Sequence, residues 1–172
     1  MNKIERVRAT LAGKPVDRPP FTAWYHFGTQ HASPEQTAEV HLGFFEAYDF
    51  DFLKVMNDYD YPMPDGMETM ATAADLKRLS VFDVAKTPMG NQLRALEIIA
   101  KKLKGKALFV DTLFTAWNTI RRNLVKEALP RLMAEHPQEL LEALKVVNQN
   151  LIQYALASLD RGSAGIFFSV PA

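Results

Sequence analysis

Short apolar runs alternate along this chain with longer stretches in which apolar residues recur at the helical period. The apolar runs occupy residues 21–25, 50–56, 107–111 and 165–170, and the longer patterns lie between them. Parallel strands need crossover connections, and helices in those connections cover both faces of a sheet. The alternation therefore predicts an α/β fold built from parallel β/α units, in which the four runs are parallel strands that lie side by side in chain order.

The first two helices are marked by residues typical of helix ends. Residues 4–11 form a short lead-in helix, which Gly13 closes because glycine accepts the left-handed conformation. Ser33 can cap the next helix, and Gln36 completes a capping box. That helix should run to about residue 48. We expect it to bury Val40, Phe44, Phe45 and Tyr48.

Three further helical patterns follow. Residues 91–103 carry an apolar stripe, and residues 116–133 carry another that contains Pro130. Proline inside a helix removes a hydrogen bond, so we expect a break near residues 128–129. A last helix restarts at residue 137 and ends at about residue 162.

The least regular part of the chain is residues 57–88, which is rich in proline, aspartate and tyrosine. Connections of this length in a compact domain are typical of lids or binding loops. Residues 74–79 are expected to form a helical turn within it. Asp60 and Asp65 are interpreted as turn residues.

Composition excludes several classes of function. The 172 residues carry no net charge and no cysteine, and 48% are hydrophobic. Because the basic residues are scattered, we expect no nucleic-acid partner. The chain starts without the apolar core of a signal peptide, and no run is long enough to span a bilayer, so we expect a cytoplasmic protein without a membrane partner.

Parallel β/α units build either an open doubly wound sheet or a closed eight-stranded barrel. Neither a Gly-x-Gly-x-x-Gly nor a phosphate-binding Gly-x-x-x-x-Gly-Lys motif is present, which disfavours nucleotide binding without excluding the open sheet. The residue pattern by itself leaves both arrangements open.

Three stretches resemble the uroporphyrinogen decarboxylase family, which also includes cobamide-dependent methyltransferases. Residues 5–20 resemble the start of a member, with the pattern R-x-x-x-x-L-x-G-K-x-V-D-R-x-P. Residues 51–58 and 162–169 are similar to the second and fourth strands of the family. The resemblance implies that residues 1–172 form the N-terminal half of a TIM (β/α)8 barrel, with a lead-in helix and with the site at the carboxyl ends of the strands.

The resemblance implies two activities, and the sequence does not choose between them. One is decarboxylation of a tetrapyrrole-class substrate, with Asp58 nearest to the family's catalytic aspartate. The other is methyl transfer that involves a corrinoid protein. A family decarboxylase has an arginine-rich segment after its first strand, but residues 24–30 contain no arginine. Guanidinium groups suit substrate carboxylates, so this departure disfavours the decarboxylase.

The methyltransferase branch implies a zinc site made by a histidine and cysteines in the second half of the barrel. We expect no cofactor and no metal ligand in this chain, with zinc and a corrinoid left to a full-length protein. His41 and His136 are expected to have structural roles.

In such barrels, chemistry sits where strands end. We expect His26, Asp58 and Asp111 to converge on one pocket as catalytic residues. The expected substrate-binding residues are Trp24, Tyr25, Asn57, Tyr59, Thr112 and Ser169.

A third hypothesis belongs to another class: a non-catalytic half-barrel, either a fragment or an interaction module. The chain ends straight after the fourth apolar run, so isolated strand edges would expose Phe21, Trp24, Phe167 and Phe168. Either a homo-oligomer or a complementing half-barrel is then expected to cover them.

Overall fold

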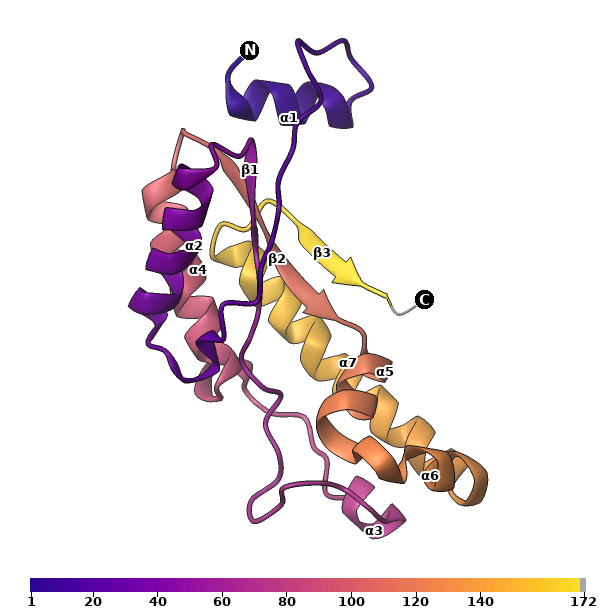
Figure 1. The fold of residues 1–172 in the computed structure, drawn as a ribbon. Coiled ribbons are helices and arrows are strands. Elements are labelled where there is room, and N and C mark those ends of the chain that lie inside the picture. Colours follow the sequence, from indigo (N-terminus) through magenta and orange to yellow (C-terminus); the bar gives the residue numbers. More distant parts are fainter. Residues whose placement is uncertain (171–172) are drawn as a thin grey trace. The chain divides into compact units, whose positions relative to one another are not determined.

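The computed structural model describes residues 1–170, in which helices alternate with three short strands (Figure 1). The chain divides into two compact units. The first unit holds residues 1–59, 91–112 and 157–167, and the second holds residues 60–90, 113–156 and the C-terminal residues from 168. The expected α/β class is confirmed.

One parallel sheet runs through the fold. Its strands, in spatial order, are β1 (Phe52–Val55), β2 (Leu108–Phe114) and β3 (Ile166–Ser169). β1 and β2 are parallel, with Lys54 opposite Val110. Next to β3, Ala164 N–H donates to the carbonyl oxygen of Phe109 at 2.8 Å. The last three expected strands and their order are therefore confirmed.

The expected first strand, residues 21–25, is wrong, because the segment does not form a ladder with β1. Asp51 N–H donates to Phe21 O at 3.0 Å, but Phe21 N–H donates to the Asp51 carboxylate at 2.9 Å instead of to a carbonyl. Pro19 and Pro20 have no N–H to add. The segment therefore runs beside the sheet without regular pairing.

Local signals fix the first two helices. In α1 (Lys3–Leu11), the Asn2 side chain caps the first turn. In α2 (Pro34–Ala47), Ser33 and Gln36 form the expected capping box, with hydrogen bonds of 2.9 and 3.2 Å.

The buried stripe of α2 differs from the expected one. Phe45 is buried as expected, together with Thr37 and His41. Val40 and Phe44 are only half-buried, and Tyr48 lies beyond the helix end and is 62% exposed. The buried stripe includes His41 because both of its ring nitrogens have partners inside the fold. Nδ1 lies 2.8 Å from Thr37 O, and Nε2 accepts from Met56 N–H at 3.1 Å. This confirms a structural role for His41.

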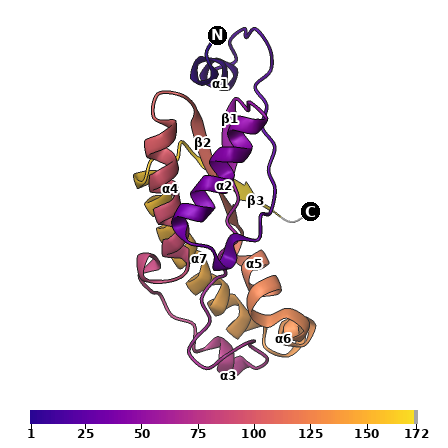
Figure 2. The same ribbon diagram turned by 60° about the vertical axis from the view of Figure 1, so that its left-hand side comes forward.

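Helices cover one face of the sheet. α2 and α4 (Met89–Leu103) lie on the same side of β1 and β2 (Figures 1 and 2). Leu53 and Val55 on β1 are fully buried. Because side chains alternate along a strand, Lys54 between them points to the opposite face.

Short helical pieces dominate the second unit. They are α3 (Ala73–Leu76), η2 (Val84–Lys86), α5 (Ala116–Thr119), η3 (Ile120–Val125), η4 (Lys126–Ala128), α6 (Leu129–Glu135) and most of α7 (Pro137–Asp160). The break expected at Pro130 is confirmed and centres on Lys126, whose φ is 46°. An α-helix would need Pro130 N–H to donate to Lys126 O, and proline has none.

The long connection between β1 and α4 is anchored within the second unit by Asn150 of α7. Its Nδ2 donates to Tyr61 Oη at 2.6 Å and to Ser80 O at 3.0 Å, and its Oδ1 accepts from Phe82 N–H at 3.1 Å. Tyr61 is buried, and burial raises its pKa to about 12. These bonds fix the connection against α7.

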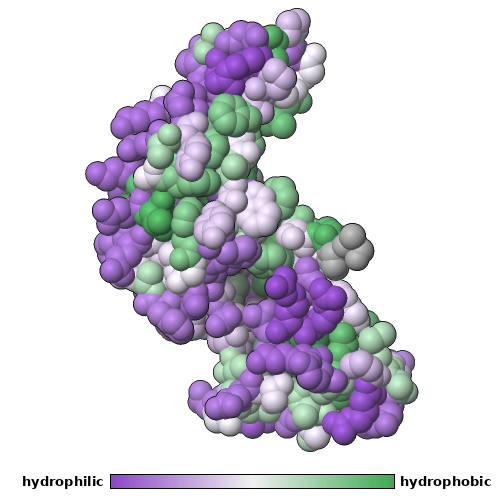
Figure 3. Space-filling view, viewed as in Figure 1, coloured by the Kyte–Doolittle hydropathy of each residue, from purple (hydrophilic) through white to green (hydrophobic). Residues whose placement is uncertain are grey.

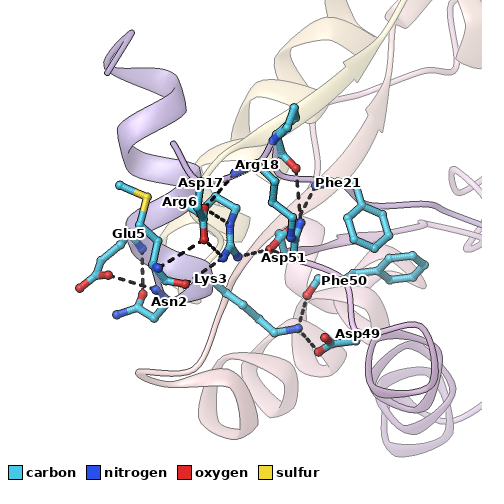
Figure 4. Close-up of polar contacts among 12 residues, drawn as sticks. Asn2, Lys3, Glu5, Arg6, Asp17, Arg18, Phe21, Asp49, Phe50 and Asp51 are labelled. Atoms are coloured by element: carbon cyan, nitrogen blue, oxygen red, sulfur yellow. Dashed lines mark hydrogen bonds and ion pairs between the residues drawn. The ribbon is translucent and has the colours of Figure 1, made fainter. Parts of the chain in front are cut away.

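An ion-pair network ties α1 to the start of β1 (Figure 4). Arg6 binds Asp17 through two nitrogens at 2.7 Å each and reaches Asp51 at 2.6 Å. Arg18 also binds Asp51, at 2.5 Å. Both arginines of the N-terminal sequence pattern therefore converge on the buried Asp51 carboxylate, and the aspartate of the pattern, Asp17, binds Arg6.

No helix within residues 1–170 combines the length and hydropathy needed to cross a membrane.

Candidate active site

A histidine and an aspartate meet just beyond the carboxyl end of β1. His26 Nδ1 lies 2.6 Å from Asp58 Oδ1. The other carboxylate oxygen accepts from Gly28 N–H at 3.0 Å and from Thr29 N–H at 3.2 Å. Gly28 has a φ of 70°, which turns the chain so that these two N–H groups face the carboxylate. The sequence thus builds a small anion-holding loop at the start of η1 (Thr29–His31).

The surroundings keep Asp58 ionised. Burial favours a higher pKa, but hydrogen bonds from His26 and Thr29 outweigh it and hold the pKa of Asp58 below its usual value. The Asp58 side chain is 6% exposed, whereas that of His26 is 54% exposed. The pair therefore joins a buried anion to an imidazole that substrate can reach.

This arrangement suits proton transfer. An ionised carboxylate that accepts from Nδ1–H orients the ring and leaves Nε2 to take up a proton. The Trp24 ring meets the His26 ring edge-on, with centroids 5.6 Å apart. Trp24 itself is 51% exposed, so it offers an aromatic surface beside the imidazole.

Asp111 does not take the position expected for it. β2 continues to Phe114, so Asp111 lies inside the strand and not at its end. Its carboxylate accepts from Gln92 Nε2 of α4 at 3.1 Å, on the helix-covered face. Gln92 also donates to Met56 O at 3.3 Å, so Asp111 helps to join α4 to the sheet. Asp111 thus lies inside β2 and binds α4, whereas His26 and Asp58 meet beyond the end of β1; its expected catalytic role stays a prediction.

Tyr59, which was expected to bind substrate, is buried. It is 7% exposed, and its hydroxyl lies 3.1 Å from Thr37 Oγ1 and donates to Ala32 O at 2.9 Å. These contacts hold the loop before α2 against the end of β1. Tyr59 thus supports the loop before α2, and its expected part in substrate binding stays a prediction.

The remaining expected residues lie as follows. Tyr25 is 63% exposed, Asn57 accepts from Tyr59 N–H through its side chain, Thr112 is buried in β2 and Ser169 is the half-buried last residue of β3. Their roles in binding stay predictions.

Lys54 is a site residue that the sequence interpretation missed. It is 5% exposed, and its ammonium lies 4.2 Å from the centroid of the Trp24 ring and 3.6 Å from that of Phe167. Burial lowers the pKa of Lys54. The signal was a single charged residue inside an otherwise apolar strand.

The described part of the chain contains no cluster of metal-binding side chains. It contains no cysteine, and residues 1–170 hold no group of three or more histidines, aspartates or glutamates placed to bind a metal ion. The donor set therefore does not fit zinc.

Parallel β/α units, with helices packed against the sheet, define a domain of the α/β class. Among solved structures, the chain is similar to one described as a methyltransferase from Methanosarcina mazei, with a TM-score of 0.74 and 19% sequence identity. The match covers 96% of this chain and 58% of that protein, so this chain spans less than two thirds of that protein's length. This likeness establishes a related fold. No protein-family model matches the sequence, and neither does any curated protein.

Proposed function

We propose that the protein containing this chain is a methyltransferase of the uroporphyrinogen decarboxylase family, and that the chain forms the first half of its (β/α)8 barrel. The observation that carries the proposal is the similarity in fold to the Methanosarcina mazei methyltransferase, which extends over 96% of this chain. The sequence pattern of residues 5–20 supports it independently. Its charged residues form the ion-pair network around Asp51.

His26 and Asp58 are the groups that we assign to the chemistry. Asp58 holds the imidazole in place, and Nε2 of His26 removes the proton of an incoming thiol. The resulting thiolate is the nucleophilic form of sulfur. The thiolate attacks the methyl group of a methylated corrinoid, which a partner protein carries as a substrate. The sulfur–carbon bond forms as the cobalt–carbon bond breaks, and the electron pair of the broken bond leaves with the cobalt, which is released as Co(I).

Decarboxylation of a porphyrinogen is the second candidate reaction. Asp58 lies just beyond the end of β1, and the family's catalytic aspartate lies at the end of the corresponding strand. A substrate with several carboxylates needs several charge-assisted donors, and residues 24–30 offer none from arginine. This observation favours methyl transfer.

Zinc enters no step that we assign to this chain. The donor set on these residues does not fit the metal. The proposal therefore concerns only how residues of this chain bind, orient and deprotonate the thiol substrate.

A non-catalytic half-barrel is the alternative from another class. Aromatic residues are exposed at both edges of the sheet: Phe167 is 46% and Phe168 53% exposed on β3, and Phe21 and Trp24 are 48% and 51% exposed beside β1. Hydrophobic surface is visible around β3 (Figure 3). Uncovered apolar strand edges promote association. A second copy or a complementing half-barrel would cover them, and light scattering on the purified chain distinguishes a well-behaved monomer from an assembly.

The proposed function is tested by paired assays on the full-length protein. One assay follows demethylation of methylcobalamin in the presence of a thiol, by absorbance and by detection of the thioether. The other follows stepwise loss of CO2 from uroporphyrinogen. We expect thiol methylation without efficient decarboxylation. Efficient decarboxylation would instead assign the protein to the founding activity of the family.

A further inference from the structure

Lys54 is a buried cation whose contacts are aromatic. Its ammonium lies over the rings of Trp24 and Phe167, and within residues 1–170 it forms no ion pair with a carboxylate. The rings offset part of the cost of burial, since a cation is attracted to the face of an aromatic ring. Buried charges in proteins are ordinarily paired, so this position lacks an anion.

A second unsatisfied group lies on the same face of the sheet. Lys54 is opposite Val110 in the parallel register, and Thr112 is two residues further along β2. Side chains two residues apart in a strand point to the same face. Thr112 is 1% exposed, and its hydroxyl has no hydrogen-bond partner among the described residues. One buried cation and one buried hydroxyl on this face therefore both lack a polar partner within residues 1–170.

We propose that Lys54 and Thr112 form a subsite for a single carboxylate group carried on a flat, apolar molecule. The ammonium supplies the counter-charge, and the hydroxyl donates a hydrogen bond to one carboxylate oxygen. The Trp24 and Phe167 rings are about half exposed, so their free surfaces flank the apolar body of the ligand.

The available groups favour a carboxylate over a phosphate. A phosphate dianion has three strong acceptor oxygens and is usually bound by several cations or by guanidinium groups. This face offers one ammonium, one hydroxyl and two rings. The subsite is argued from these four residues alone, so it does not depend on which reaction the protein catalyses.

Binding of benzoate is the test, with neutral benzamide as the matched ligand and inorganic phosphate as the competing anion. Binding is followed by NMR through the indole N–H signal of Trp24, which is assigned with a Trp117→Phe variant. The variants are Lys54→Met and Thr112→Val, with Lys106→Met as the control because Lys106 is exposed.

We expect benzoate to bind the wild type and the Lys106→Met variant equally, and benzamide to bind neither. Lys54→Met should weaken benzoate binding at least about tenfold, and Thr112→Val should weaken it by a smaller factor. Equal binding of benzoate to Lys54→Met, or no binding to the wild type, would overturn the subsite. If inorganic phosphate bound the subsite more tightly than benzoate does, the choice of a carboxylate would be overturned.

Stability provides the second measurement. Methionine matches the length of the lysine stem without its charge, so Lys54→Met should raise the denaturation midpoint of the unliganded protein if the ammonium lacks an anion. A lowered midpoint would contradict the proposal, because it would show that the contacts of the ammonium in the unliganded protein already outweigh the cost of its burial.

Discussion

At the scale of single residues, Asp51 is the centre of the N-terminal network. Its side chain is fully buried and binds two arginines and the Phe21 N–H. Burial favours a higher pKa, but the bonds from Arg18, Phe21 and Arg6 together lower the pKa of Asp51. The carboxylate thus compensates two cations at the point where α1 meets β1.

Asp51→Asn should destabilise the protein by about 3 kcal/mol, because it leaves Arg6 and Arg18 without their shared anion. Urea denaturation followed by circular dichroism measures the loss. Asp49→Asn is the matched control: Asp49 is 85% exposed, and asparagine accepts its φ of 50°. Equal midpoints for the two variants would contradict the account of the network.

His41 predicts a dependence of stability on pH. Burial lowers the pKa of His41 below 6.5, against smaller opposing effects of Thr37 O and Asp58. The unfolded chain therefore binds a proton at a pH at which the folded chain does not. The contribution of neutral His41 to the free energy of unfolding is fully present above about pH 7.5. It declines as the pH falls through 6.5, where the histidine of the unfolded chain becomes charged.

The free energy of unfolding should consequently fall between pH 7.5 and pH 5.5. His41→Gln should reduce this fall, although it also lowers stability at both values by about 1–3 kcal/mol if Met56 N–H loses its acceptor. His31→Gln is the control, since His31 is exposed. An unchanged fall in the His41 variant would show that another group is responsible.

At the scale of elements, the features that could be predicted from the sequence are those formed by residues close together in the chain. The capping box of Ser33 and Gln36 was found because its partners are three residues apart. Residues 21–25 were assigned to a strand in error, because pairing depends on which N–H groups meet the neighbouring backbone. Asp111 was placed at a strand end because the sequence does not fix where β2 stops. Which face each side chain occupies, and hence the role of Lys54, emerges only from the register.

Replacing Gly43 and Gly90 by alanine should change the stability of the protein in opposite directions. A Cβ on Gly90 would lie 2.2 Å from Ala85 O, whereas a Cβ on Gly43 in α2 meets nothing within 4 Å. Gly43→Ala should stabilise the protein by about 0.5–1 kcal/mol, because alanine favours the helix. Gly90→Ala should destabilise it by about 1–3 kcal/mol through overpacking. Thermal unfolding of both variants checks this, and a stabilised Gly90→Ala would contradict the close approach.

At the scale of the whole molecule, three features bear on the proposed methyl transfer. They are the parallel sheet, the similarity in fold to a methyltransferase, and the histidine–aspartate pair. The exposed aromatic residues beside β1 and on β3 indicate apolar surfaces that promote association. The residues of this chain that we assign to the reaction are His26 and Asp58.

The most direct test of that claim is the rate of thiol methylation by the full-length protein carrying Asp58→Asn. We expect kcat to fall about 100-fold or more with little change in KM, since the carboxylate orients the general base without touching the substrate. Asp60→Asn, in the same loop and exposed, should keep the wild-type rate. A folded Asp58→Asn enzyme that retains the wild-type kcat would contradict the assignment of this pair as the reaction centre.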